Sequence, residues 1–408
     1  MAGTHSGAHG PSGGAGGGVS GAGGVNLLAL RSHNGAVVLD LLRGAGPHGI
    51  SRLEVAERMG LTPQAVSKIT ARLRADGLVT EAGRRASTGG KPPTVLRLVP
   101  EAGYAVGLHL DRDKLTAVLC DLTGTVVAER NAPLSLGAGA DAVIEGAAGE
   151  VEALLAQARE ELGAADPEPP PMEPSSPPLL SSLLPPFAVL GVGVALPGPL
   201  DHLHGVLHRV TGFPEWEGYP LRAALARRLG MPVVVDKDTN AAALGLAAVA
   251  GPLGAGSFAY LHLGTGLGAG LVIDGNVRRG ARTRAGELGH QVIQLDGPLC
   301  ACGSRGCIEA LCLAAVARGD MDEAARVLGT GAANLVGLLD IELVLLGGRT
   351  VEAHPDVFVR GVGLVLDEWA RRQGADPAVP VRVASGGSSG VAEGAAQLML
   401  APLFGRAE

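Results

Sequence analysis

Short apolar runs alternate with longer amphipathic segments from about residue 103 to the end of the chain. We expect strands at residues 105–110, 116–120, 126–129, 188–195, 233–236, 257–263, 269–273 and 343–346. We expect helices at residues 142–162, 221–229, 240–250, 321–339 and 357–372. Such alternation is typical of an α/β fold. The sequence contains no convincing short-period repeat.

Length and composition indicate several domains. A chain of 408 residues is too long for one ordinary domain, so we expect two or three. With 46% hydrophobic but only 2% aromatic residues, Val, Leu and Ala must do most of the core packing. Residues 1–26 are rich in Gly and Ser and are expected to form a disordered tail. The proline-saturated residues 165–186 are expected to form a flexible surface insertion.

The sequence also indicates a cytoplasmic location. We find no signal peptide, and no apolar stretch reaches the ~20 residues that a bilayer crossing requires. The five cysteines are few and mostly clustered, which suits a reducing compartment better than a set of disulfides. We therefore expect no membrane partner.

The net charge of −7 is unevenly distributed along the chain. Residues 31–98 contain 11 Lys or Arg against 5 Asp or Glu, a balance of +6 that leaves −13 for the rest. A basic module joined to an acidic body suggests that the first part binds a polyanion and that the second does not.

The basic module contains the pattern of a helix-turn-helix. Residues 53–59 form a short amphipathic stretch that ends at Gly60. Thr62 is a good N-cap and Pro63 a good first residue for a second helix that runs to about residue 75. The second helix of such a motif enters the major groove of DNA, where polar side chains reach base edges and phosphates. The expected DNA contacts here are Thr62, Gln64, Ser67, Lys68 and Arg72.

Two expected strands, at residues 77–81 and 94–99, follow the second helix. The Gly/Pro-rich loop between them is basic and resembles a wing that contacts the phosphate backbone or the minor groove through Arg84, Arg85 and Lys91. The alternative is a small packing domain whose charges face water. The helix cap, the glycine turn, the wing and the charge balance agree, so we favour DNA binding.

A glycine-rich turn and a carboxylate occur in the α/β region. Residues 261–275 read as strand, glycine turn and strand, and such a turn can hold a phosphate, although glycine turns between strands are common. Asp238 follows an expected strand and begins an expected helix. It could accept a proton from a sugar hydroxyl, but on this pattern alone the role of a helix cap is favoured.

His290, Cys300, Cys302 and Cys307 lie within eighteen residues, together with turn-forming glycines. Three thiolates and one imidazole are the donor set of a closed, structural zinc site. The alternatives are unmetallated buried thiols or a redox pair. A zinc ion here would hold the nearby Glu287 and Glu309 in place beside a ligand. The remaining cysteines, Cys120 and Cys312, are expected to be ordinary apolar residues.

Several motifs resemble those of the ROK family (repressor, open reading frame, kinase). They are STGGKPP (87–93), VALPGP (194–199), DTNAAALG (238–245), GTGLGAG (264–270), GELGH (286–290), CACGSRGC (300–307) followed by Glu309, and LLGG (345–348). The resemblance implies a winged helix-turn-helix at residues 27–98. It also implies a two-lobed actin/hexokinase-like, ribonuclease H-like ATPase fold at residues 103–408, which would serve as a sensor domain.

The resemblance also implies functional residues and partners. Zinc ligands are implied at His290, Cys300, Cys302 and Cys307. Contacts with sugar hydroxyls are implied at Asp238, Glu287, His290 and Glu309. The implied partners are a double-stranded DNA operator and a sugar or sugar derivative, and the implied assembly is a homodimer or homotetramer.

Two departures from the family pattern bear on activity. Family kinases begin this domain with D-x-G-G-T, whereas residues 109–113 here read HLDRD, so Asp111 and Arg112 replace the two glycines. We expect side-chain bulk and repulsion of the triphosphate by Asp111 and Asp113 to prevent productive ATP binding, so the chain is not expected to be an enzyme. Gly212 and Lys237 also stand where family members usually have Asn; Lys237 could favour an acidic or phosphorylated ligand or be a surface charge.

These expectations combine in a transcriptional regulator, a repressor of carbohydrate-related genes that a sugar-like ligand controls. One alternative is an active sugar kinase with an accessory DNA-binding domain. Another is a ligand-free regulator with a vestigial pocket and a metal loop that serves folding alone.

Overall fold

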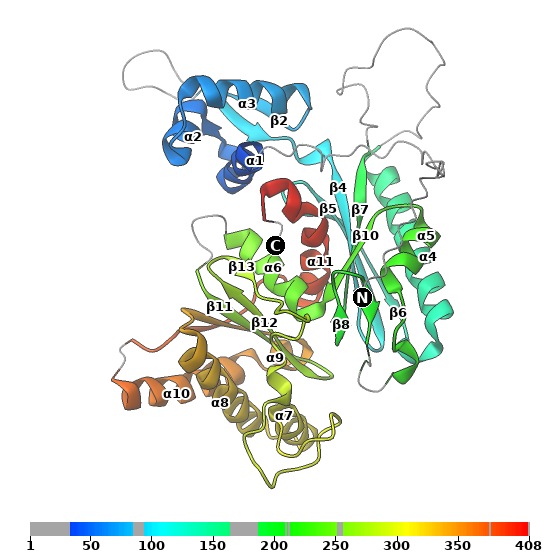
Figure 1. Ribbon diagram of the computed structural model, residues 1–408, viewed down its shortest axis with the longest axis vertical. Coiled ribbons are helices and arrows are strands. Elements are labelled where there is room, and N and C mark those ends of the chain that lie inside the picture. Colours follow the sequence, from blue (N-terminus) through cyan, green and yellow to red (C-terminus); the bar gives the residue numbers. More distant parts are fainter. Residues whose placement is uncertain are drawn as a thin grey trace, which may run out of the picture.

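The computed structural model describes residues 33–84, 94–163, 187–208, 210, 213–250, 256–374 and 377–406. Figure 1 shows a small N-terminal module above two larger lobes, each built around a sheet. Within these ranges no helix is both long and apolar enough for a membrane crossing. The expectations for residues 1–26, residues 165–186 and Gly212 concern parts of the chain outside the described ranges.

The N-terminal module consists of three helices and a small antiparallel sheet with the strand order β1-β3-β2. Its elements are α1 (His33–Ala45), β1 (Ile50–Ser51), α2 (Arg52–Met59), α3 (Pro63–Ala75), β2 (Val79–Arg84) and β3 (Thr94–Leu98). A capping box between Ser51 and Glu54 starts α2, and Gly60 ends it with a left-handed φ of 62°. Thr62 caps α3, as the sequence predicts. The helix-turn-helix is therefore confirmed.

The first lobe contains a five-stranded sheet in the order β10-β7-β4-β5-β6. Its strands are β4 (Tyr104–Leu110), β5 (Lys114–Asp121), β6 (Val126–Pro133), β7 (Val189–Leu196) and β10 (Val233–Lys237). The first three form an antiparallel meander, and β7 and β10 run parallel to β4. The helices α4 (Ala140–Glu161) and α5 (Leu221–Leu229) cover one face, and α11 (Gly390–Leu400) covers the other. A short ribbon of β8 (Leu200–Asp201) and β9 (Val206–Leu207) precedes α5.

The second lobe repeats this topology with the order β13-β12-β11-β14-β15. Its strands are β11 (Phe258–Leu263), β12 (Leu267–Ile273), β13 (Asn276–Val277), β14 (Leu343–Gly347) and β15 (Val381–Val383). One face of the sheet packs on α6 (Asp238–Ala250). The other packs on α7 (Ile308–Ala317), α8 (Met321–Leu339) and α10 (Pro355–Gln373), and the short α9 (Arg349–Ala353) follows β14. In both lobes an antiparallel meander is extended by two parallel strands on the side of its first strand.

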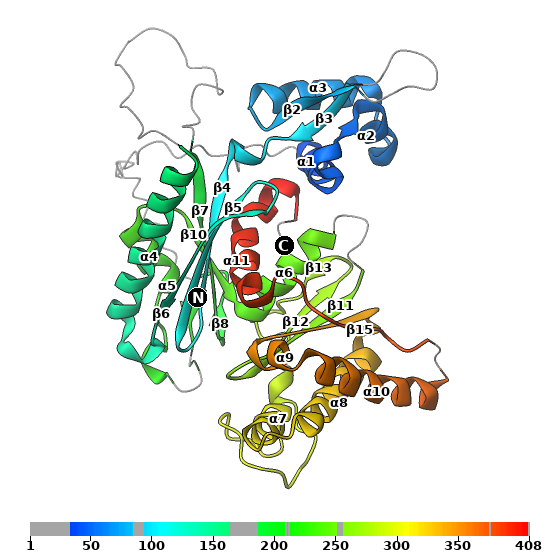
Figure 2. The same cartoon turned by 180° about the vertical axis from the view of Figure 1, so that it is seen from behind.

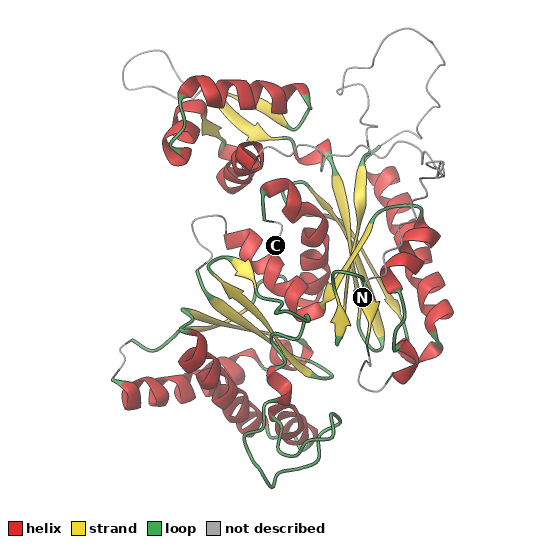
Figure 3. Cartoon of the chain, viewed as in Figure 1, coloured by secondary structure: helices red, strands yellow, loops and turns green. Residues whose placement is uncertain are grey.

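The helices α6 and α11 pack against each other between the two sheets, as Figure 3 shows. They approach closely because the crossing is made by glycines: a Cβ on Gly245 would lie only 3.0 Å from the Cα of Gly394. The helix α6 begins at Asp238, so the expected sugar-contacting carboxylate lies at the start of a helix that is central to the fold.

The N-terminal module is fastened to the first lobe through α1, which packs on the 3₁₀ helix η9 (Ala401–Phe404) that follows α11 (Figure 2). The apolar core of the module continues into the core of the lobe. The shared buried cluster includes Val38, Leu42, Leu400 and Phe404. Because burying apolar surface contributes roughly 25 cal/mol per Å², a continuous core makes this attachment a stable one.

A buried ionic network closes the same junction. The carboxylate of Asp40 accepts hydrogen bonds from Arg43 and Arg406, each at 3.0 Å. Arg406 also donates to the carbonyl of Ala247 in the last turn of α6 at 2.9 Å, and Arg43 donates to Gln397 at 3.1 Å. The three charged side chains are only 7% to 14% exposed. Since buried charges are costly unless paired, this network holds the module in one position.

Candidate functional site

A cavity of about 100 Å³ lies between the two lobes. The four side chains expected to contact a ligand, Asp238, Glu287, His290 and Glu309, all line it. The first lobe contributes the β4–β5 hairpin and the end of β10, and the second lobe contributes the glycine turn between β11 and β12 and the segment that leads to α7. The fold therefore brings together carboxylates that are up to 71 residues apart in the sequence.

Asp238 is the first residue of α6 and lies in the wall of this cavity. Its Oδ1 accepts a hydrogen bond from the backbone N–H of the next residue, Thr239, at 2.6 Å, whereas a helix cap accepts from a residue two or three positions further on. Loss of water around the carboxylate raises its pKa to about 7, and the nearby Asp111 and Glu287 add to the effect. At neutral pH this group can therefore accept a hydrogen bond from a hydroxyl when it is ionised, or donate one to a hydroxyl when it is protonated.

Lys237 is buried beside Asp238, so its interpretation as a surface charge is wrong. Its side chain is 4% exposed, and its Nζ donates to Glu287 at 2.9 Å and to the carbonyl of Ala285 at 2.6 Å. A buried ammonium requires such partners because an unpaired charge in the interior is strongly destabilising. Glu287 neutralises this cation, so Lys237 gives no electrostatic reason to expect an acidic ligand.

The glycine turn is held by contacts with both flanking helices. The carboxylate of Glu309, in the first turn of α7, accepts a hydrogen bond from the backbone N–H of Leu267 at 2.9 Å. A Cβ on Gly270 would collide with the carbonyl of Thr239 and lie 2.7 Å from the Cβ of Ala243. Close packing of α6 on β12 therefore requires a glycine at this position, whether or not a phosphate ever binds at the turn.

The β4–β5 hairpin carries the acidic residues that we expect to repel a triphosphate. Arg349, at the start of α9 in the other lobe, donates to Asp111 at 2.7 Å and to Asp113 at 3.0 and 3.2 Å. One guanidinium thus pairs with both carboxylates, which weakens the electrostatic part of the expectation that they repel a triphosphate. The steric part of the argument remains, since Arg112 lines the cavity and its guanidinium lies 5.6 Å from the ring centre of Phe213.

A second, larger cavity of about 450 Å³ lies on the other side of this hairpin. Asp111 and His262 line both cavities. His262 accepts or donates a hydrogen bond with the hydroxyl of Tyr260 at 2.9 Å. Burial lowers the pKa of His262 and lowers that of His109 to about 4, so both imidazoles are neutral at physiological pH.

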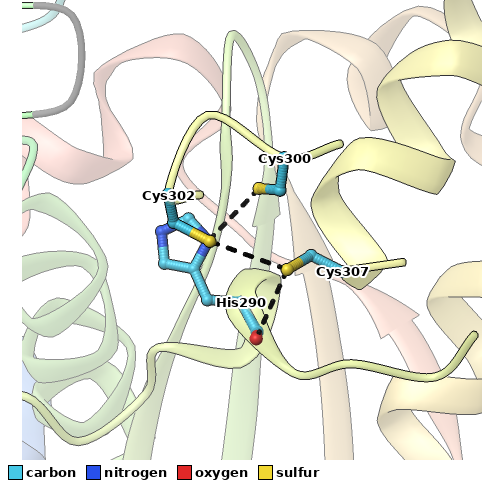
Figure 4. A group of neighbouring side chains, drawn as sticks. All are labelled: His290, Cys300, Cys302 and Cys307. Atoms are coloured by element: carbon cyan, nitrogen blue, oxygen red, sulfur yellow. Dashed lines mark hydrogen bonds between the residues drawn. The ribbon is translucent and has the colours of Figure 1, made fainter. Parts of the chain in front are cut away.

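The four expected metal ligands converge, as Figure 4 shows. Their donor atoms all lie within 4.8 Å of one another. The sulfurs of Cys302 and Cys307 are 3.7 Å apart, and the sulfur of Cys300 is 3.7 Å from Nδ1 of His290. A tetrahedral zinc ion with Zn–S distances of about 2.3 Å separates its sulfur ligands by about 3.8 Å. The arrangement therefore fits a zinc ion.

The backbone of the loop explains this convergence. Isolated bridges pair Val292 with Cys307 and Leu299 with Arg305, which folds the loop back on itself. Gly306 has a φ of 66°, and a Cβ there would collide with the carbonyl of Gln294. By contrast, Cys120 and Cys312 are fully buried in apolar surroundings, as predicted.

The helix α3 presents the expected DNA contacts to solvent. Its apolar residues Val66 and Leu73 are buried in the module. The residues on the exposed side include Thr62, Gln64, Ser67, Lys68 and Arg72. The guanidinium of Arg72 also lies 3.9 Å from the carboxylate of Asp76.

The expected wing is only partly described. Arg84 is the last residue of β2, and nothing beyond its backbone is described. Arg85 and Lys91 lie outside the described residues. The two strands that would carry the wing are paired in an antiparallel register, with Val79 opposite Leu98.

Two pairings in the site are absent from the sequence-based expectations. The ion pair of Lys237 with Glu287 had one available signal: a lysine that directly follows an apolar, buried strand needs an anionic partner. The contacts of Arg349 had no signal in the sequence, because an arginine that follows two glycines is common and its partners are more than 230 residues away.

Comparisons with known proteins agree with this architecture. The ROK family profile matches residues 180–318. The xylose repressor of Caldicellulosiruptor bescii is 29% identical over 260 residues, which cover 64% of this chain and 59% of that protein. The alignment thus spans less than two thirds of that relative.

Solved structures share the fold. A ROK family transcriptional regulator, a homologue of the E. coli MLC protein, superimposes with a TM-score of 0.66 at 21% identity, covering 92% of this chain and 98% of that chain. The ROK hexokinase of Thermus thermophilus superimposes with a TM-score of 0.52 at 28% identity, covering 72% of this chain and 96% of that chain. Residues 180–318 thus match the ROK family, and the two-lobed fold around them is similar to that of solved ROK proteins.

Proposed function

We propose that this protein is a DNA-binding transcriptional repressor whose two-lobed domain senses a sugar or sugar derivative. The observation that carries this proposal is the exposed polar face of α3 on a module whose opposite side is buried against the first lobe. A helix presented in this way can enter a major groove without unfolding any part of the protein. The xylose repressor among the relatives supports the same reading.

The ligand pocket fits a polyhydroxyl compound. Asp238, Glu287 and Glu309 offer carboxylate oxygens at one cavity, and carboxylates are good acceptors for sugar hydroxyls. The lobes contribute different walls, so a ligand that contacts both would favour their closed arrangement. Two modules in a homodimer or homotetramer would then bind a two-fold operator, with a spacing that depends on the ligand.

The proposed cofactor is a structural zinc ion held by His290, Cys300, Cys302 and Cys307. With four protein ligands the ion has no open position for water, so its contribution is to hold the loop rather than to activate a substrate. The loop leads directly into α7, and Glu309 lies in the first turn of that helix. The ion would therefore position the carboxylate of Glu309 and the imidazole of His290 at the pocket.

We also propose that the protein transfers no phosphoryl group. In the β4–β5 hairpin, Asp111 and Arg112 replace the glycines expected in a kinase of this family. Their side chains, together with Arg349, occupy space that a triphosphate would need to approach the backbone. The competing candidate is a sugar kinase, which the likeness to a ROK hexokinase favours. A coupled ATP-turnover assay across hexoses, pentoses and amino sugars separates the two: sugar-dependent turnover would establish the kinase.

DNA binding is tested by footprinting on the region upstream of the protein's own gene, with the full chain. We expect protection of a two-fold site, and we expect Lys68→Ala to weaken binding at least about fivefold, because a phosphate or base contact is worth about 1–3 kcal/mol. Arg372→Ala is the matched control, because Arg372 is an exposed residue of α10 in the second lobe that pairs within its own helix. Equal binding by both variants, or no sequence-selective protection, would count against the proposal.

Ligand sensing is tested separately by thermal shift against a panel of sugars. A binding sugar should raise Tm in proportion to the logarithm of its concentration. Glu309→Gln should reduce that shift. If no sugar stabilises the protein, the result supports a vestigial pocket and contradicts regulation by a sugar.

A further inference from the structure

Arg349 connects the two lobes directly. It is the first residue of α9, immediately after β14 of the second lobe, and its partners Asp111 and Asp113 lie in the β4–β5 hairpin of the first lobe. Gly348 precedes it with a φ of 92°, and a Cβ there would lie 2.5 Å from the carbonyl oxygen of Leu263. The close approach of Gly348 to β11 fixes the position of the Arg349 backbone.

The contact has the geometry of a specific pair. The two terminal nitrogens of Arg349 donate to the two oxygens of Asp113 at 3.0 and 3.2 Å, and one of them also donates to Asp111 at 2.7 Å. A planar guanidinium suits such a forked arrangement, which a lysine could not reproduce.

The hairpin is braced to receive this arginine. The backbone N–H of Asp111 donates to the carbonyl of Lys114 at 2.9 Å, and the backbone N–H of Leu134 donates to the carbonyl of Asp113 at 3.3 Å. The two carboxylates are therefore presented by a closed turn rather than by a loose loop.

The position of the contact matters because Asp111 lines both cavities. Arg349 lines the larger cavity and holds the residue that separates it from the ligand pocket. Without the hydrogen bond from Arg349, Asp111 could move away from Asp238. The wall that the first lobe contributes to the pocket would then be more mobile.

We propose that Arg349 is an interlobe latch: it holds the two lobes against each other and positions Asp111 at the ligand pocket without a bound nucleotide. Water screens the attraction between these side chains and makes the latch weak, since Arg349 is 46% exposed and Asp113 is 63% exposed. Partly exposed pairs shift an equilibrium modestly, on the order of tenfold for a bidentate pair with a second carboxylate. A shift of that size is enough to set the resting state of two lobes that a ligand must still be able to move.

The experiment compares the full chain with Arg349→Ala and with a matched control, Arg360→Ala. Arg360 also forms an exposed pair with an aspartate, Asp322 at 3.7 Å, but both partners belong to the second lobe. Small-angle scattering and hydrogen exchange are measured without DNA or sugar. We expect Arg349→Ala to enlarge the radius of gyration and to speed exchange in the β4–β5 hairpin roughly tenfold, and Arg360→Ala to match the wild type.

Two further measurements complete the test. High salt should move the wild type toward the behaviour of Arg349→Ala, because salt screens an exposed pair. The exchanged pair Arg349→Asp with Asp113→Arg should restore the compact form, provided that circular dichroism shows each variant folded. If Arg349→Ala, folded, scatters and exchanges like the wild type, the latch does not exist. These measurements involve no operator DNA. A failed footprint would therefore not contradict the latch, and a failed test of the latch would not contradict DNA binding.

Discussion

Asp40 of α1 and Arg406, 366 residues later in the chain, form an ion pair at 3.0 Å that joins the N-terminal module to the first lobe. Arg406 also holds the carbonyl of Ala247, at the end of the helix that begins with Asp238 in the ligand pocket. One side chain thus contacts both the N-terminal module and the helix that leads from the pocket.

Removing the carboxylate from this junction should be costly. Asp40→Ala leaves the guanidiniums of Arg43 and Arg406 buried beside each other without their shared anion. We expect a loss of about 3–5 kcal/mol in the free energy of unfolding, measured by urea denaturation. Asp322→Ala, which removes an exposed aspartate of α8, should change it by less than about 1 kcal/mol. Equal effects of the two substitutions would mean that the junction is not an energetic anchor.

The pair of Lys237 and Glu287 should respond unequally to the loss of either member. Glu287→Gln leaves a buried ammonium with neutral acceptors and no counter-charge, whereas Lys237→Met leaves a carboxylate that is 35% exposed and can be hydrated. We therefore expect Glu287→Gln to destabilise the protein by about 3 kcal/mol and Lys237→Met by about 1 kcal/mol. Chemical denaturation of both variants and of the double variant checks this order, and the reverse order would contradict the burial argument.

The stability of the protein should depend on pH through Asp238. The pKa of this group is raised from 3.8 to about 7 in the folded state, so the folded state binds the proton more tightly than the unfolded state between these values. Its contribution to stability therefore falls as pH rises through that window and is constant above it. Asp238→Asn should flatten this part of the profile of Tm against pH, whereas Asp322→Asn should leave the profile as it is.

Metal content is a direct test of the cysteine loop. We expect one zinc ion per chain by elemental analysis, and a strong chelator should lower Tm by several degrees, since structural zinc contributes to folding. Cys302→Ala should lose the ion. Ser304→Ala, in the same loop but outside the donor set, should keep it. A full zinc complement in Cys302→Ala would exclude this residue as a ligand.

Local signals in the sequence predicted local structure well. Gly60, Thr62 and Pro63 mark the boundary of two helices because caps and left-handed glycines act within one turn. The cluster of His290 with Cys300, Cys302 and Cys307 could also be predicted, because these residues lie close together in the sequence.

Relationships across the fold were harder to predict. The pairing of Lys237 with Glu287, and of Arg349 with Asp111, joins segments whose distance in space depends on how the lobes meet. The repeated strand order of the two lobes cannot be recognised in the sequence for a similar reason. Backbone hydrogen bonds define this repeat, and different apolar residues can form the same strands.

The attachment of the N-terminal module to the first lobe has a consequence for biosynthesis. Asp40 of α1 is synthesised 366 residues before Arg406, the partner with which it pairs across the junction. Until then α1 can pack only on α3 and β3 of its own module and not on η9. Until Arg406 is synthesised, the N-terminal module therefore has no fixed orientation on the first lobe.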